Sequence, residues 1–145
     1  MPSTPTFPHY TAAADQTLIH YTRAGSGPLL LLIHGSLCDY RYWRWQLPAL
    51  GQGYTVVAPS LPGYWPDALD REDPSFSIAR HTDAMLAFIR HIGDGRPVHV
   101  LGQRARHLAG DRRDHVARAV GRQLGAEDHR TSRQVAAQAG GTTDD

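Results

Sequence analysis

The segment with the clearest chemical potential is a short His-Gly loop that follows an unbroken apolar run. Residues 29–33 are all Leu or Ile, and His34, Gly35, Ser36 and Leu37 come directly after them. Glycine lets the backbone turn tightly, so that an N–H group just beyond it can point at an oxygen that gains negative charge in a reaction. The pattern predicts an oxyanion-binding loop. The alternative is an ordinary turn from strand to helix, because a His-Gly pair alone is common.

Two side chains near this turn carry groups that can act as nucleophiles. Ser36 has no identifiable base, so we expect it to be a turn residue. Cys38 lies near the start of a predicted helix, where the helix dipole can lower a thiol pKa; a small packing residue is the favoured alternative. Cys38 is the single cysteine. A chain with one cysteine can form neither an internal disulfide nor a cysteine-based zinc cluster.

An aromatic cluster follows, made of Tyr40, Tyr42, Trp43 and Trp45. At helical spacing some of these residues must belong to the core, and Tyr40 and Trp43 are our candidates for lining an apolar pocket.

No metal or cofactor site is expected. His81, His91 and His99 are too dispersed to suggest a set of metal ligands. The glycines at 25–27 precede a strand rather than a helix, so they do not form a phosphate-binding loop.

The elements that must position these residues alternate between β- and α-type patterns. Short β-rich runs are predicted at 17–22, 29–33, 54–58 and 97–101, and helical spacing at 40–50 and from Ile78 to Ile92. Ser75 or Ser77 can cap the second helix. This order predicts an α/β fold with a mostly parallel sheet flanked by helices.

The chain divides into three parts by composition. Residues 1–16, rich in Pro, Thr and Ala, are expected to form a flexible leader. Residues 17–124 are expected to form a partial domain. Beyond Gly102 there is no Ile, Phe, Met, Tyr or Trp, so this stretch has little with which to build a core. We expect 125–145 to be a disordered tail.

The ordered set of motifs resembles the N-terminal part of the α/β-hydrolase family. The apolar strand, the His-Gly loop, the helix, the strand leading into 60–64 and the strand 98–102 match the family's order. The resemblance implies a mostly parallel sheet and hydrolysis of an ester, amide or similar bond by a nucleophilic serine. It also implies that complete relatives take small ester-like substrates, and that His34 supports the loop rather than transferring protons.

The sequence departs from that family where the nucleophile should stand. The family reads Gly-x-Ser-x-Gly after this strand, whereas here Gly102 is followed by Gln103, Arg104, Ala105 and Arg106. Arg104 takes the place of the nucleophile, and a guanidinium stays protonated near neutral pH. We therefore expect no intact catalytic residue. A shifted reading frame in the gene is one hypothesis for the arginine-rich segment.

The acid and histidine of a triad are not identified either. The polar residues that could be named are more simply solvated: Asp111, Asp114, Glu127, Asp128 and His129. We expect a fragmentary or frame-disrupted, inactive form. The alternative is a non-catalytic binding or self-associating protein that uses the edge of strand 97–101.

The overall composition excludes little else. The net charge is +1, and all 15 basic residues are arginine, balanced by 14 acids. We expect no nucleic-acid partner, since no strongly basic surface is implied. No secretory signal or membrane-spanning run is recognisable, so a cytoplasmic protein is the expectation.

Overall fold

The computed structural model describes residues 6–68, 72–73 and 76–103. Its strands are β1 (His9–Ala14), β2 (Thr17–Ala24), β3 (Leu29–Ile33), β4 (Thr55–Pro59) and β5 (Val98–Gly102); its helices are the 3₁₀-helix η1 (Tyr40–Trp45), α1 (Leu47–Leu50) and α2 (Ile78–Gly93). Several predictions fall outside the described residues: Arg104, the tail at 125–145 and the polar residues from Asp111 to His129.

The five strands form one mixed sheet in the order β1-β2-β4-β3-β5. β3 pairs in parallel with β4 on one side and β5 on the other. β2 joins β4 antiparallel, and β1 joins β2 antiparallel. The predicted α/β fold class, a partial α/β-hydrolase fold, is confirmed, with its parallel part centred on β3.

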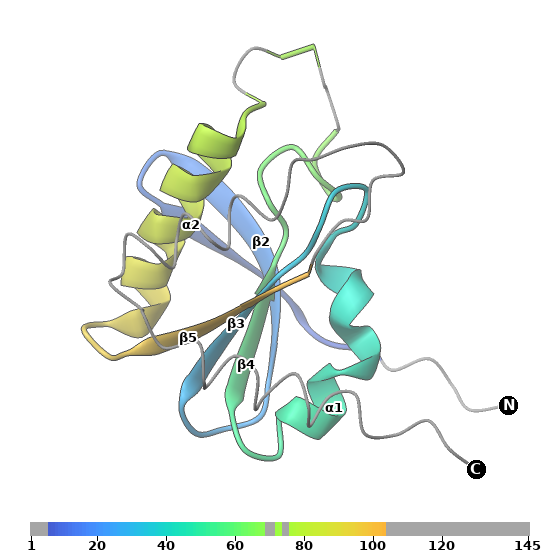
Figure 1. The fold of residues 1–145 in the computed structure, drawn as a ribbon, viewed down its shortest axis with the longest axis vertical. Helices are drawn as coiled ribbons and strands as arrows, with labels where there is room; N and C mark the ends of the chain where they lie inside the picture. The colour runs from blue at the N-terminus through green and yellow to red at the C-terminus, as the bar shows by residue number, and fades with distance from the viewer. Residues whose placement is uncertain (1–5, 69–71, 74–75, 104–145) are drawn as a thin grey trace, which may run out of the picture.

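Helices cover both faces of this sheet, with α2 on one face and η1 and α1 on the other (Figure 1). Side chains of a strand alternate between faces, so Leu29, Leu31 and Ile33 pack with the α2 side and Leu30 and Leu32 with the η1 side. All five are buried. This double cover explains why the run is apolar without alternation.

The leader predicted for residues 1–16 is wrong at 9–14, which form β1. Ala14 pairs with Thr17, so the turn has two residues, and Asp15 adopts a positive φ of 52° that Asp tolerates well. Ala12 and Ala14 are buried in the α2-side core. Small alanines give a weak strand signal, which is why composition alone suggested a leader.

The two predicted helices differ in outcome. The pattern at 40–50 yields η1 and then α1, because Pro48 lacks an N–H and its ring would clash with the Arg44 carbonyl of a continuous helix. α2 matches its prediction, and Ser77 caps it by accepting a hydrogen bond from the Arg80 N–H. The prediction is wrong for Ile78, which was expected on the apolar face of this helix but is 47% exposed.

Candidate active-site loop

The carboxyl ends of three parallel strands bring three loops together. β3, β4 and β5 end at Ile33, Pro59 and Gly102 at one edge of the sheet, which we call the carboxyl edge. The strand that follows β3 in the chain, β4, pairs on one side of β3, and the next strand, β5, pairs on its other side. The connection to β4 covers one face of the sheet and the connection to β5 covers the other. In open α/β sheets, ligands bind outside the carboxyl ends of strands at such a switch point.

His34 ties the loop after β3, residues 34–39, to the loop after β4. Its ring is 3% exposed. Nε2 accepts a hydrogen bond from the Leu61 N–H at 2.9 Å, so the proton must lie on Nδ1, which donates to the Gly35 oxygen at 2.8 Å. Burial lowers the pKa of His34, which keeps the ring neutral and able to accept. These contacts support the predicted loop-holding role.

A second buried histidine, His81 of α2, holds the same β4 loop. Its Nε2 donates to the Pro62 oxygen at 3.0 Å, and burial lowers its pKa. The ring of Tyr64 lies between the two histidines, 5.0 Å from His34 and 5.8 Å from His81 by ring centroids. Gly63 turns here with a φ of 82°, a conformation that glycine adopts without strain.

Gly35 itself is bound by Gln103, directly after β5. The Gly35 N–H donates to the Gln103 Oε1 at 3.3 Å, and the Gln103 N–H donates to the Ile33 oxygen at 2.9 Å. Among the described residues, the N–H groups of Ser36 and Leu37 have no hydrogen-bond acceptor. Both groups can therefore donate to a further acceptor, and the predicted oxyanion-binding role stays a prediction.

The backbone of Leu37 is strained. It has a φ of 65° and its side chain is 70% exposed, although a branched side chain disfavours this left-handed conformation. The predicted loop, His34 to Leu37, is therefore a tight turn in which His34 and Gly35 are hydrogen-bonded and Ser36 and Leu37 are exposed.

The remaining predicted candidates, Cys38, Tyr40 and Trp43, lie in or directly after this loop. Burial raises the pKa of the Cys38 thiol, and the nearby Asp39 charge raises it further, which disfavours a reactive thiolate. Tyr40 and Trp43 are buried in the η1-side core; the Tyr40 N–H also donates to the Ser60 hydroxyl oxygen at 3.2 Å. A pocket role for either residue stays a prediction.

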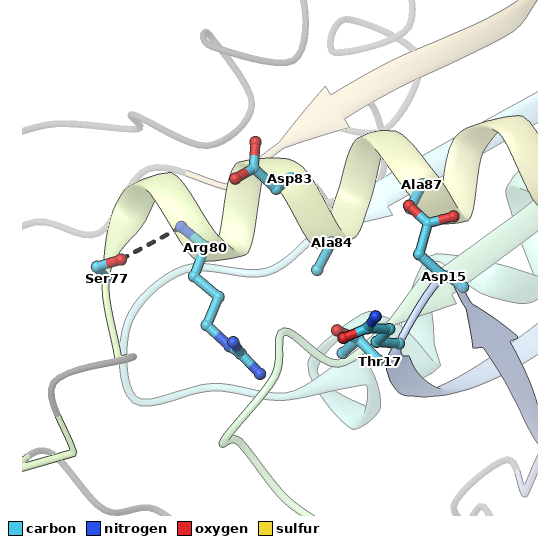
Figure 2. A pocket seen from close by; sticks show the side chains of 9 residues that line it. Asp15, Thr17, Ser77, Arg80, Asp83, Ala84 and Ala87 are labelled. Carbon is cyan, nitrogen blue, oxygen red and sulfur yellow. Dashed lines mark hydrogen bonds between the residues drawn. The ribbon is translucent and has the colours of Figure 1, made fainter.

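A cavity of about 500 Å³ lies elsewhere, between the β1–β2 turn and α2 (Figure 2). Asp15 and Thr17 border it from the turn, and Arg80 and Asp83 from the helix. None of the loop residues 34–37 lines it. Three alanines line it beside these polar residues, and because it opens to solvent we assign no ligand to it.

Sequence reasoning missed three contributors to this edge. Nothing in the spacing marks Gln103 as a partner of Gly35, Ser60 as a partner of Tyr40, or His81 as a partner of the β4 loop. The sheet order and the packing of α2 bring these residues together. The β4 loop at 60–64 was predicted through its place in the family's order, without any contact to the β3 loop. In the described part of the chain, no helix is long and apolar enough to cross a membrane.

Comparison with known proteins matches residues 30–103 to the Alpha/beta hydrolase family. A soluble epoxide hydrolase of Corynebacterium sp. (strain C12) is 34% identical over 117 residues, covering 76% of this chain and 39% of the relative. The bifunctional epoxide hydrolase 2 of Rattus norvegicus is 30% identical over 85 residues, covering 58% of this chain and 15% of the relative.

The similar solved structures also include epoxide hydrolases. The crystal structure of epoxide hydrolase VrEH1 from Vigna radiata superimposes with a TM-score of 0.60 at 30% identity, covering 67% of this chain and 32% of that one. The present chain therefore spans well under half the length of these relatives. The family match ends at Gln103, one residue before Arg104.

Proposed function

This chain belongs to the alpha/beta hydrolase family, and we propose that it is a non-catalytic member that keeps the oxygen-binding loop without a nucleophile. One observation carries the proposal: Arg104 stands two residues after Gly102, the last residue of β5. In the family pattern the nucleophile occupies that position. A guanidinium stays protonated near neutral pH and cannot attack an electrophile.

The retained half of the site supports binding of a small molecule with a polarised oxygen. The relatives are named epoxide hydrolases, and opening an epoxide ring leaves negative charge on its oxygen, as attack on an ester carbonyl does. The N–H groups of Ser36 and Leu37 are suited to such an oxygen. We propose an epoxide or ester ligand, bound without turnover in the cytoplasm and without a cofactor.

Binding and turnover can be measured on one sample. The full chain, labelled with ¹⁵N, would be titrated with styrene oxide while diol formation is followed by chromatography. We expect chemical-shift changes at the Ser36 and Leu37 amides and no diol. Diol formation above the buffer rate would refute the non-catalytic assignment, and unchanged loop amides would refute retained binding.

A parallel assay tests the missing nucleophile with p-nitrophenyl esters. We expect no turnover by the natural chain. An Arg104→Ser variant, with Arg112→Ser as the matched control, tests whether a serine at this position restores attack. Turnover by the natural chain that a serine-directed inhibitor abolishes would overturn the proposal.

A frame-disrupted gene is the proposed origin of the arginine at 104. The support is the abrupt change of composition after Gly102, beyond which there is no Ile, Phe, Met, Tyr or Trp. Sequencing the coding DNA tests the idea. If no alternative frame encodes Gly-x-Ser-x-Gly at this point, the frame-disruption hypothesis fails, while the non-catalytic assignment remains open to the assays above.

Self-association through β5 is a second candidate function. Within the described residues β5 is the last strand of the sheet and pairs only with β3. Its Val98, Val100 and Leu101 are only half-buried, whereas every residue of β3 and β4 is buried. An unpaired edge is a template for another strand. Size-exclusion chromatography should then give a concentration-dependent dimer, and a monomer at all concentrations would exclude it.

A further inference from the structure

Two histidines face each other on the neighbouring strands β1 and β2. In the antiparallel register His20 lies opposite Thr11, and His9 lies two residues before Thr11. The two histidines are therefore a diagonal pair on one face of the sheet, a spacing within reach of long side chains. His9 Nε2 lies 3.0 Å from His20 Nδ1.

A carboxylate orients the second histidine from behind. Asp67 Oδ1 lies 3.3 Å from His20 Nε2, and Asp67 Oδ2 accepts a hydrogen bond from the Gly63 N–H at 3.2 Å. A carboxylate at this distance favours a proton on Nε2, which leaves the Nδ1 lone pair of His20 directed toward His9. A carboxylate on the far nitrogen of a histidine is the usual outer partner of a metal-ligating imidazole.

From this arrangement we propose a binding site for a divalent transition-metal ion of the Zn²⁺ type, held by His9 Nε2 and His20 Nδ1. Zn²⁺ binds imidazole nitrogen at about 2.0–2.1 Å, so two nitrogens on one tetrahedral ion lie about 3.3 Å apart. Binding replaces the present hydrogen bond of 3.0 Å between these nitrogens: the proton of the neutral His9 ring moves from Nε2 to Nδ1, and the two nitrogens separate by a further few tenths of an ångström. His9 is exposed and able to make this movement.

The ion would keep open coordination positions. Among the described residues no group of three or more His, Cys, Asp and Glu is arranged to hold a metal, so water completes the shell of a two-histidine site. Tyr40 lies alongside, with its ring centroid 5.8 Å from that of His9. Imidazole ligands suit Zn²⁺, Ni²⁺ and Cu²⁺, whereas Mg²⁺ and Ca²⁺ prefer oxygen.

Isothermal titration of the full chain with ZnCl₂ tests the site. We expect binding to weaken at least tenfold in His9→Asn and in His20→Asn. In Asp67→Asn it should weaken ten- to a hundredfold, because the outer partner is lost. His91→Asn is the matched control, since His91 is an exposed histidine on α2, and its affinity should equal that of the natural chain. MgCl₂ should give no competition.

Imidazole ¹H–¹⁵N spectra identify the ligating atoms and separate this site from the other histidines of the chain. On adding Zn²⁺, the resonances of His9 Nε2 and His20 Nδ1 should shift, while far-UV circular dichroism confirms that each variant is folded. Equal Zn²⁺ affinity in the natural chain and in the His9→Asn/His20→Asn double variant would overturn the proposal. An unchanged affinity in Asp67→Asn would overturn the role of the carboxylate.

Discussion

The loop after β3 is held differently on its two sides. Toward β4 it is fixed by buried groups, because His34 binds the Leu61 N–H and the Tyr40 N–H binds Ser60. Toward β5 it is fixed by one longer hydrogen bond, from the Gly35 N–H to the half-buried Gln103 side chain. We therefore expect the contacts toward β4 to hold the loop conformation more strongly than the single contact toward β5.

This difference separates loop geometry from catalysis. The contacts of the β4 side join His34 to Leu61 and Tyr40 to Ser60, so the loop can persist in a protein that lacks a nucleophile. The β5 side leads directly to that position and is where the sequence leaves the family pattern. Substitutions that remove one contact at a time measure how much each side contributes to the free energy of unfolding.

The largest effect is expected from His34→Ala. The change leaves the buried Leu61 N–H without its acceptor and opens a void beside Tyr64, so we expect a loss of about 3 kcal/mol in the free energy of unfolding. Urea denaturation measures it. The control His91→Ala, at an exposed position, should change stability by no more than about 0.5 kcal/mol. Similar losses in both variants would contradict a dominant β4 side.

A fall in pH should weaken the contacts that hold the loop toward β4 and so lower the free energy of unfolding. Burial lowers the pKa values of His34 and His81, although hydrogen bonds to the Gly35 and Pro62 oxygens raise them in part. The unfolded chain, with a histidine pKa of about 6.5, therefore binds protons first as the pH falls. Stability is complete above about pH 6.5 and declines toward the lower folded-state pKa, by at most about 1.4 kcal/mol per pH unit for each histidine.

Urea denaturation at a series of pH values between 7.5 and 5 checks this decline. The His34→Ala variant retains only the His81 contribution, so its stability should fall less steeply over this range. A variant that loses stability as steeply as the natural chain would show that other groups cause the acid sensitivity.

A smaller loss is expected from Ser60→Ala. The Ser60 hydroxyl accepts the Tyr40 N–H in a buried setting, so its removal should cost about 1–2 kcal/mol. Ser26→Ala, in an exposed turn, is the matched control. Unfolding by guanidinium gives both values. If Ser60→Ala loses no more stability than the control, the Tyr40–Ser60 contact does not contribute to holding the loop.

The sequence predicted the strand and turn that carry the site better than the residues that bond to that turn. Leu29–Ile33 and the His34-Gly35 turn were predictable because a buried parallel strand has a distinctive apolar run. β1 was missed because alanines carry little strand signal. The partners of the loop were missed for another reason: Gln103 and Leu61 lie far from it in the chain, and only the sheet order brings them together.

The smallest effect is expected from Gln103→Ala, which removes the side-chain bond of the β5 side. The acceptor is half-buried and the bond is 3.3 Å long, so the free energy of unfolding should fall by no more than about 0.5–1 kcal/mol. Hydrogen exchange gives the sharper readout: the Gly35 amide should exchange faster, while the Leu61 amide, bound by His34, should keep its rate. Gln52→Ala, at an exposed turn, should alter neither. If Leu61 accelerates together with Gly35, the two sides act as one unit, and position 103 influences the whole loop.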